Sequence, residues 1–64
     1  MSNHKARITA LAVEVLGSNE KAAFWLRTPN RALRGKAPID EIGTELGYRA
    51  VEYVLYAIAY GMYS

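Results

Sequence analysis

The sequence of 64 residues is long enough for one domain and too short for two. It contains no cysteine, which excludes disulfides and thiolate metal sites as sources of stability. Eight basic and six acidic residues give a net charge of only +2, so the charge balance does not indicate nucleic-acid binding.

Hydrophobic residues make up 52% of the sequence, which is more than the interior of so small a body can hide. We therefore expect some of them to face another protein. The first residues do not form a secretion signal, because Glu14 interrupts the apolar run. The uncharged stretch over residues 53–63 is shorter than the roughly 20 residues of a membrane-spanning helix, so we expect a cytoplasmic protein.

The first predicted helix covers residues 5–16, and Gly17 follows it as a stop signal. Its apolar residues recur at the i, i+3, i+4, i+7 spacing that lines one side of a helix. These residues are Ile8, Leu11, Ala12 and Val15.

A second helix is predicted over residues 19–27. Ser18 or Asn19 can accept a hydrogen bond from a free amide of its first turn, and Glu20 suits the positive end of the helix. We expect Trp25 to lie at the centre of the core and Phe24 to lie nearer the rim. The inward positions of this helix are Ala22, Trp25 and Leu26.

The segment TPNRALRG, residues 28–35, has the pattern of a complete short helix. Thr28 is its predicted cap, Pro29 occupies the first turn, where a missing N–H costs nothing, and Gly35 ends it. Leu33 points inward in this interpretation.

The segment KAPIDEIG, residues 36–43, repeats the same pattern. Pro38 opens a short helical turn, and Asp40 and Glu41 stand near its amino end. One of the two isoleucines, Ile39 or Ile42, is expected to be buried.

The last predicted helix covers residues 47–60 and ends at Gly61. One stripe of this helix faces its own core and consists of Val51, Val54, Leu55, Ile58 and Met62. Nothing in the sequence alternates as a strand would. The chain is therefore predicted to be an all-α domain spanning residues 1–64, a small bundle of four to five short helices with a core of Leu11, Val15, Trp25, Leu26, Leu33, Val51, Leu55 and Ile58.

Four tyrosines lie on the side of the last helix opposite this stripe: Tyr53, Tyr56, Tyr60 and Tyr63. Tyrosine offers a large rigid area with a polar tip, which is why protein interfaces favour it. The alternative is that these rings lie over neighbouring helices with their hydroxyls in water. We favour a partner surface, either that of another protein or that of a second copy of this chain.

No residues with the pattern of a catalytic or cofactor site are found in the sequence. His4 is the only histidine, it is expected in a solvated chain end, and no cysteine accompanies it to hold a metal. Asp40 and Glu41 are sequence neighbours, so on a helix they diverge by about 100° and do not form a catalytic pair. We expect no enzyme activity and no cofactor.

The one concentration of basic residues consists of Arg27, Arg31, Arg34 and Lys36. These residues are usually solvated, or paired here with Asp40 and Glu45. They could also contact nucleic acid beside Trp25 and Phe24, or anchor an acidic rim on a protein partner.

In order and spacing, the chain resembles the C-terminal toxin-binding domain of the Xre/MbcA/ParS family of bacterial antitoxins. The resemblance covers nearly the whole chain and rests above all on Thr28-Pro29-Asn30 followed by Leu33 and Gly35. Its other elements are Leu16-Gly17, Lys21-Ala22, Trp25-Leu26, Pro38, Thr44-Glu45, Gly47, Val51, Leu55, Ile58 and the closing Gly61-Met62-Tyr63-Ser64.

This resemblance implies a protein that neutralises a RES-domain toxin, an enzyme similar to ADP-ribosyltransferases that uses NAD, by covering its active-site cleft. The carboxyl end of the chain would then lie close to the blocked site. Family members usually carry a helix-turn-helix region ahead of this domain, and since this sequence shows none, DNA binding is not expected. The predicted partner-binding residues are Tyr53, Tyr56, Tyr60, Met62, Tyr63, Ser64, Arg31 and Arg34.

Overall fold

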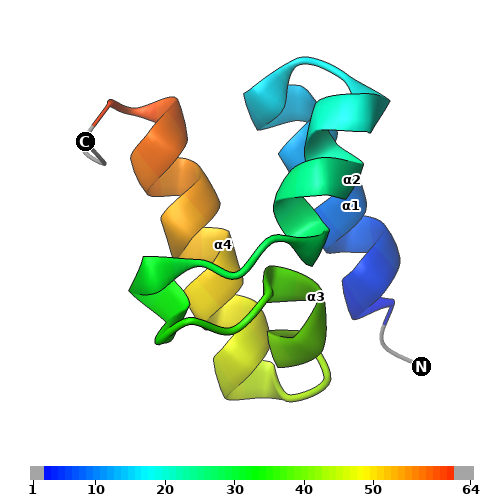
Figure 1. The fold of residues 1–64 in the computed structure, drawn as a ribbon. Helices are drawn as coiled ribbons and strands as arrows, with labels where there is room; N and C mark the ends of the chain where they lie inside the picture. Colours follow the sequence, from blue (N-terminus) through cyan, green and yellow to red (C-terminus); the bar gives the residue numbers. More distant parts are fainter. Residues whose placement is uncertain (1–2, 62–64) are drawn as a thin grey trace.

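The computed structural model describes residues 3–61 and is all-α, as predicted (Figure 1). Four α-helices and one short 3₁₀ helix follow each other along the chain, which agrees with the predicted four to five helices. Their bounds are α1 His4–Leu16, α2 Asn19–Arg27, η1 Arg31–Leu33, α3 Pro38–Glu41 and α4 Glu45–Ala59.

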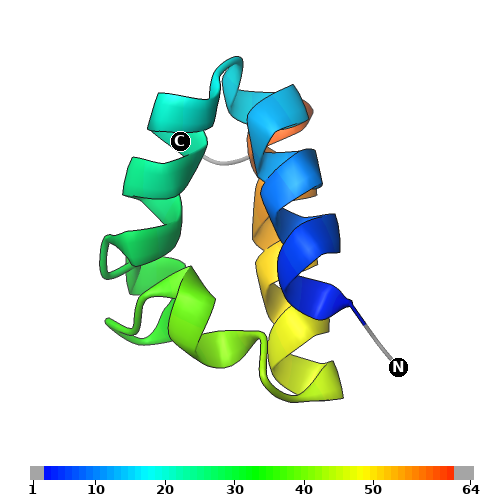
Figure 2. The same ribbon diagram turned by 90° about the vertical axis from the view of Figure 1, so that its right-hand side faces the viewer.

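The helices form two layers, which are clearest when Figures 1 and 2 are compared. The two longest helices, α1 and α4, lie side by side and run in the same direction in one layer. The chain from α2 through η1 to α3 forms the other layer, and it contacts α1 through α2 and α4 through both η1 and α3. Within residues 3–61 the longest helix, α4, has 15 residues, and none of the helices has the length and apolarity to cross a membrane.

Side-chain caps begin both α2 and α4 where the sequence offers them. The Ser18 hydroxyl accepts a hydrogen bond from the Lys21 amide at 3.1 Å, which fixes the start of α2. The Thr44 hydroxyl accepts one from the Gly47 amide at 3.0 Å, so α4 begins two residues before the predicted position. At the carboxyl end of α1, Gly17 adopts the left-handed conformation (φ 99°) that ends many helices.

The prediction of a complete short helix over residues 28–35 is wrong. The Thr28 hydroxyl donates back to the Phe24 carbonyl and so belongs to the end of α2. It is the Asn30 side chain that caps the segment, accepting from the Ala32 amide at 2.8 Å, and only the three residues of η1 are helical. Asn and Thr are both common N-cap residues, so the sequence alone does not show whether Thr28 or Asn30 caps this segment.

The core is formed by small and branched side chains from all five helices. Four of the predicted core residues are buried: Leu26, Leu33, Val51 and Leu55. The other four are only partly buried and pack around the core: Leu11, Val15, Trp25 and Ile58. The remaining buried apolar residues are Ile8, Ala12, Ala22, Ile42, Val54 and Ala57.

Trp25 is therefore not the core centre, contrary to the prediction. The largest fully buried side chains are Ile8, Val51 and Leu55 from the α1–α4 layer and Pro38 from α3. An indole is seldom fully buried even in larger proteins, and a 64-residue domain has little interior to enclose one. Phe24 is exposed, as expected.

His4 is not a solvated residue of a chain end, which corrects another prediction. It is the first residue of α1, and its side chain is only 18% exposed. Its ring stacks on the Tyr48 ring with centroids 4.3 Å apart, while Nδ1 lies 3.3 Å from the Ile42 carbonyl oxygen and Nε2 lies 3.4 Å from Glu45 Oε1. His4, Ile42, Glu45 and Tyr48 thus form an amino-end junction that joins α1 to the start of α4.

Gly47 allows α3 to approach α4 closely at the same end. It is buried, and a Cβ atom placed on it would collide with the Glu41 carbonyl group at the end of α3. The Glu41 carbonyl group belongs to the backbone, so it cannot move aside as the end of a flexible side chain can. The position therefore requires glycine for reasons of space rather than of backbone conformation.

Candidate functional site

The outer side of α4 carries three exposed tyrosines, which we call the tyrosine face. Tyr53 is 68% exposed, Tyr56 41% and Tyr60 73%. Val51 and Leu55 on the same helix are completely buried, so the two sides of α4 differ as the sequence predicted. Exposed tyrosine rings in such a row are typical of a surface that another protein covers.

Two of these rings are already ordered relative to each other. The Tyr56 and Tyr60 rings stack with centroids 6.3 Å apart and an angle of 16° between their planes. Because the two rings already stack, covering them with a partner would cost less side-chain entropy of these tyrosines.

Beside the tyrosine face, α1 and α4 leave a groove. Its carboxyl half is a hollow of ≈ 420 Å³, and its amino half is a second hollow of ≈ 420 Å³. Leu11, Glu14 and Tyr56 line both halves, which makes them one continuous α1–α4 groove. The carboxyl half is lined by Leu11, Glu14, Val15, Tyr56, Ala59 and Tyr60, and the amino half adds Arg7, Ala10, Tyr48 and Glu52.

The contribution of α1 to this surface was not predicted. Leu11 and Val15 were assigned to the core on their spacing, yet they are only partly buried, and their exposed parts line the groove. Spacing places residues on one side of a helix but does not show how far the neighbouring helix covers that side. The exposure of Leu11 and Val15 depends on how α4 packs against α1.

Arg31 and Arg34 are not part of the tyrosine face. Both are exposed, and they belong to η1 and its end in the second layer of the molecule. Within residues 3–61, neither lies within ion-pair distance of a carboxylate. The basic segment was expected to pair with Asp40 and Glu45, but the ion pairs are different ones. Lys36 lies 4.0 Å from Glu41. Glu45 is contacted instead by Arg49, at 3.2 Å, and by His4.

Three of the predicted partner-binding residues lie outside the described part of the chain: Met62, Tyr63 and Ser64. Their contribution to binding stays a prediction.

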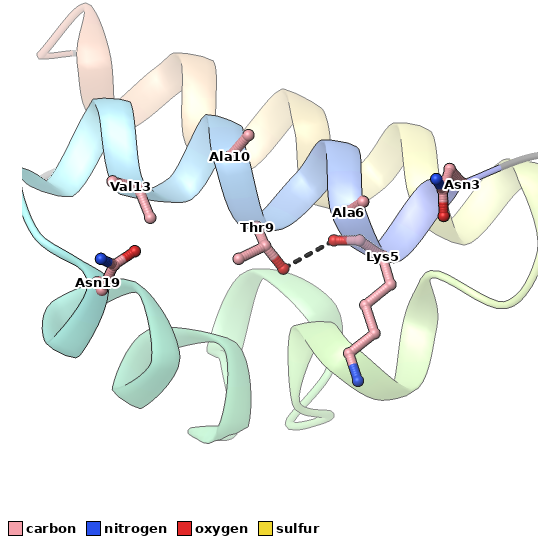
Figure 3. Close-up of a pocket in the computed structure, with 7 residues that line it drawn as sticks. All are labelled: Asn3, Lys5, Ala6, Thr9, Ala10, Val13 and Asn19. Atoms are coloured by element: carbon pink, nitrogen blue, oxygen red, sulfur yellow. Dashed lines mark hydrogen bonds between the residues drawn. The ribbon is translucent and has the colours of Figure 1, made fainter.

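Another hollow, of ≈ 640 Å³, lies along α1 and shares Ala10 with the amino half of the α1–α4 groove (Figure 3). Small side chains such as Ala6 and Ala10 line it, and the Thr9 hydroxyl is already engaged with the Lys5 carbonyl at 2.7 Å. Over residues 3–61 no group of three or more histidines, aspartates or glutamates is placed to hold a metal ion.

Comparison with known proteins identifies the family. The model of the antitoxin Xre/MbcA/ParS C-terminal toxin-binding domain matches residues 11–61. The chain belongs to this family. It is also 39% identical over 56 residues to a protein named Antitoxin Xre from Pseudomonas putida. The match covers 88% of this chain but only 35% of that relative, and no solved structure gave a significant match.

Proposed function

We propose that this antitoxin-family domain binds and neutralises a RES-type toxin, an enzyme similar to ADP-ribosyltransferases that consumes NAD. In this proposal the tyrosine face covers the toxin's active-site cleft in the cytoplasm and keeps NAD or the target out. The domain itself acts by binding and catalyses nothing. Membership of the family supports the antitoxin role, and the RES type rests on the resemblance described above.

The exposure of three tyrosines on one side of α4 is the observation that carries the proposal. Burying these rings would remove several hundred Å² of apolar area from water, worth several kcal/mol at roughly 25 cal/mol per Å² before association costs. Interfaces concentrate their binding energy in a few aromatic residues of this kind.

Arg31 and Arg34 are proposed to make secondary contacts at the edge of the complex. Exposed charges at the rim of an interface mainly steer association and contribute little to final affinity. Met62, Tyr63 and Ser64 are proposed to approach the blocked cleft, as the resemblance implies.

The test is inhibition of a RES-domain toxin, which is to be sought first among the genes that adjoin this one. We expect the two proteins to co-purify and the chain to suppress NAD consumption by the toxin. Replacing Tyr56 and Tyr60 together by alanine should relieve that suppression while leaving helicity nearly intact. Full suppression by the variant, at concentrations close to the dissociation constant, would contradict the assignment of the tyrosine face.

Self-association is a second candidate, because the same exposed face would suit a second copy of the chain. Light scattering of the purified protein separates the two possibilities. A monomer at high concentration favours the toxin contact, and a dimer that persists when Tyr56 and Tyr60 are replaced would place the self-contact elsewhere.

A further inference from the structure

The carboxyl half of the α1–α4 groove combines a carboxylate with aromatic rings but holds no cation. Glu14 is the only charged residue among its six lining residues. Within residues 3–61 Glu14 forms no ion pair, and the basic residues Arg31 and Arg34 lie in the other layer. Arg7 lines the amino half of the groove, where Glu52 also lies, so the carboxyl half is a local acidic site with apolar walls.

The amino-end junction shows what such an arrangement binds within the molecule itself. There, the flat His4 ring stacks on Tyr48 and points one nitrogen at the Glu45 carboxylate. A planar nitrogen-bearing group thus lies on a tyrosine ring and meets a glutamate from α4. In the carboxyl half of the groove a glutamate and two tyrosines are present, but the planar group is missing among the described residues.

We propose that this half of the groove binds the guanidinium group of an arginine side chain. The inference rests on the proposed function in one respect, namely that the arginine is supplied by the toxin. The aliphatic part of the arginine would lie along Leu11 and Val15, and the guanidinium would stack on the Tyr56–Tyr60 pair and donate hydrogen bonds to Glu14.

Arginine suits this groove better than the other side chains that could enter it. Its guanidinium is planar, stacks on aromatic rings and carries several N–H donors in a fixed arrangement. A carboxylate receives such donors in short, charge-assisted hydrogen bonds. Lysine offers a compact, strongly hydrated charge that stacks less well, and an apolar side chain would leave Glu14 desolvated without a partner.

The first test uses Nα-acetyl-arginine amide as the probe, with Nα-acetyl-citrulline amide as its neutral isostere. In an NMR titration of the ¹⁵N-labelled chain, we expect the arginine probe to shift the amide signals of residues 11–15 and 56–60. The citrulline probe should shift them much less. Equal shifts with both probes, or shifts elsewhere only, would overturn the proposal.

Two variants assign the binding to the named groups. Glu14→Gln should weaken arginine-probe binding about fivefold, and Tyr56→Leu, which keeps an apolar side chain without a ring, should weaken it by a similar factor. Glu20→Gln is the matched control, because it removes the same charge from α2 outside the groove. An effect of Glu20→Gln as large as that of Glu14→Gln would show that only net charge matters and would contradict the site.

The second test measures affinity for the RES-domain toxin. We expect Glu14→Gln to weaken toxin binding about fivefold, with Glu20→Gln near the parent value. If replacing Tyr56 and Tyr60 weakens the toxin complex while Glu14→Gln and the arginine probe have no effect, the toxin contact stands and the arginine site falls. If the probe binds as expected but no α4 variant affects the toxin, the arginine site stands. The assignment of the toxin contact to the tyrosine face then falls, and with it the toxin as the source of the arginine.

Discussion

The two ends of the α1–α4 pair use similar residues for different purposes. At the amino end, His4, Tyr48 and Glu45 satisfy one another, and the junction is closed. At the carboxyl end, Tyr56 and Tyr60 stack next to Glu14, but α1 supplies no third group to meet them. The first arrangement holds the fold together, and the second is exposed at the place where we propose that a partner binds.

This difference separates two kinds of substitution that the sequence alone cannot distinguish. Changes at the amino end should lower the free energy of unfolding and leave the binding surface intact. Changes at the carboxyl end should weaken partner binding and leave the free energy of unfolding nearly unchanged. A domain of 64 residues has a total stability of only about 3–10 kcal/mol, so the first class is easily detected.

The largest expected effect is that of Gly47→Ala at the amino end. Alanine favours a helix over glycine by about 1 kcal/mol, but here its Cβ would collide with the Glu41 carbonyl group. We expect a net loss of about 3 kcal/mol in the free energy of unfolding, measured by chemical denaturation. Gly43→Ala is the control, because it is exposed with nothing near its Cβ and should change stability little. A Gly47→Ala variant as stable as the parent would disprove the close approach of α3 and α4.

The double variant Tyr56→Ala/Tyr60→Ala tests the open end. We expect affinity for the RES-domain toxin to fall about 100-fold, because central aromatic residues dominate interfaces. The free energy of unfolding should fall by only about 1 kcal/mol, since Tyr60 is largely exposed and Tyr56 is partly exposed. Phe24→Ala on α2 is the matched control, as it removes an equally exposed aromatic ring from the other layer. Equal losses of affinity in the two variants would remove any special role of the tyrosine face.

His4→Ala should affect stability alone. The variant loses the stacking on Tyr48 and the contacts with Ile42 and Glu45, which together stabilise by about 1.5 kcal/mol. Thermal unfolding measures this, with the exposed neighbour Lys5→Ala as the control. Toxin affinity should stay within a factor of about two, a change of less than 0.5 kcal/mol. A larger loss of affinity would mean that the amino-end junction is also part of the interface.

The smallest expected effect compares the two glutamates directly. Glu45→Gln removes the carboxylate that meets His4 and Arg49, and since Glu45 is largely exposed the loss should be only about 0.5 kcal/mol. Glu14→Gln should leave the free energy of unfolding unchanged, because no described residue pairs with it. Denaturant midpoints of the two variants measured side by side decide this, and a destabilised Glu14→Gln variant would show that the groove is closed internally.

The helices were predictable because their signals are local. The spacing of Ile8, Leu11 and Val15, the cap at Ser18 and the proline at position 38 each act within a few residues, and the structure confirms the helices that they predicted. The outward direction of the tyrosines follows from the same helical period. Features that depend on which helices become neighbours were not predictable in this way.

His4 and the groove illustrate that limit. His4 is partly buried because Glu45 and Tyr48 of α4 and Ile42 at the end of α3 meet it, and no pattern near residue 4 reveals this. The place of Glu14 in the groove likewise depends on the packing of α4 beside α1, and no pattern near residue 14 reveals it. The residue types of His4 and Glu14 alone do not show that His4 contacts Glu45 while Glu14 forms no ion pair among the described residues.

The most direct test of the central claim is cross-saturation NMR of the ¹⁵N-labelled chain bound to the unlabelled RES-domain toxin. The account predicts the strongest attenuation of amide signals over residues 53–60 of α4 and 11–15 of α1. Signals of α2 and α3 should remain close to their free intensity. Attenuation confined to α2, α3 or the arginines of η1, with the signals of the tyrosine face unchanged, would contradict it.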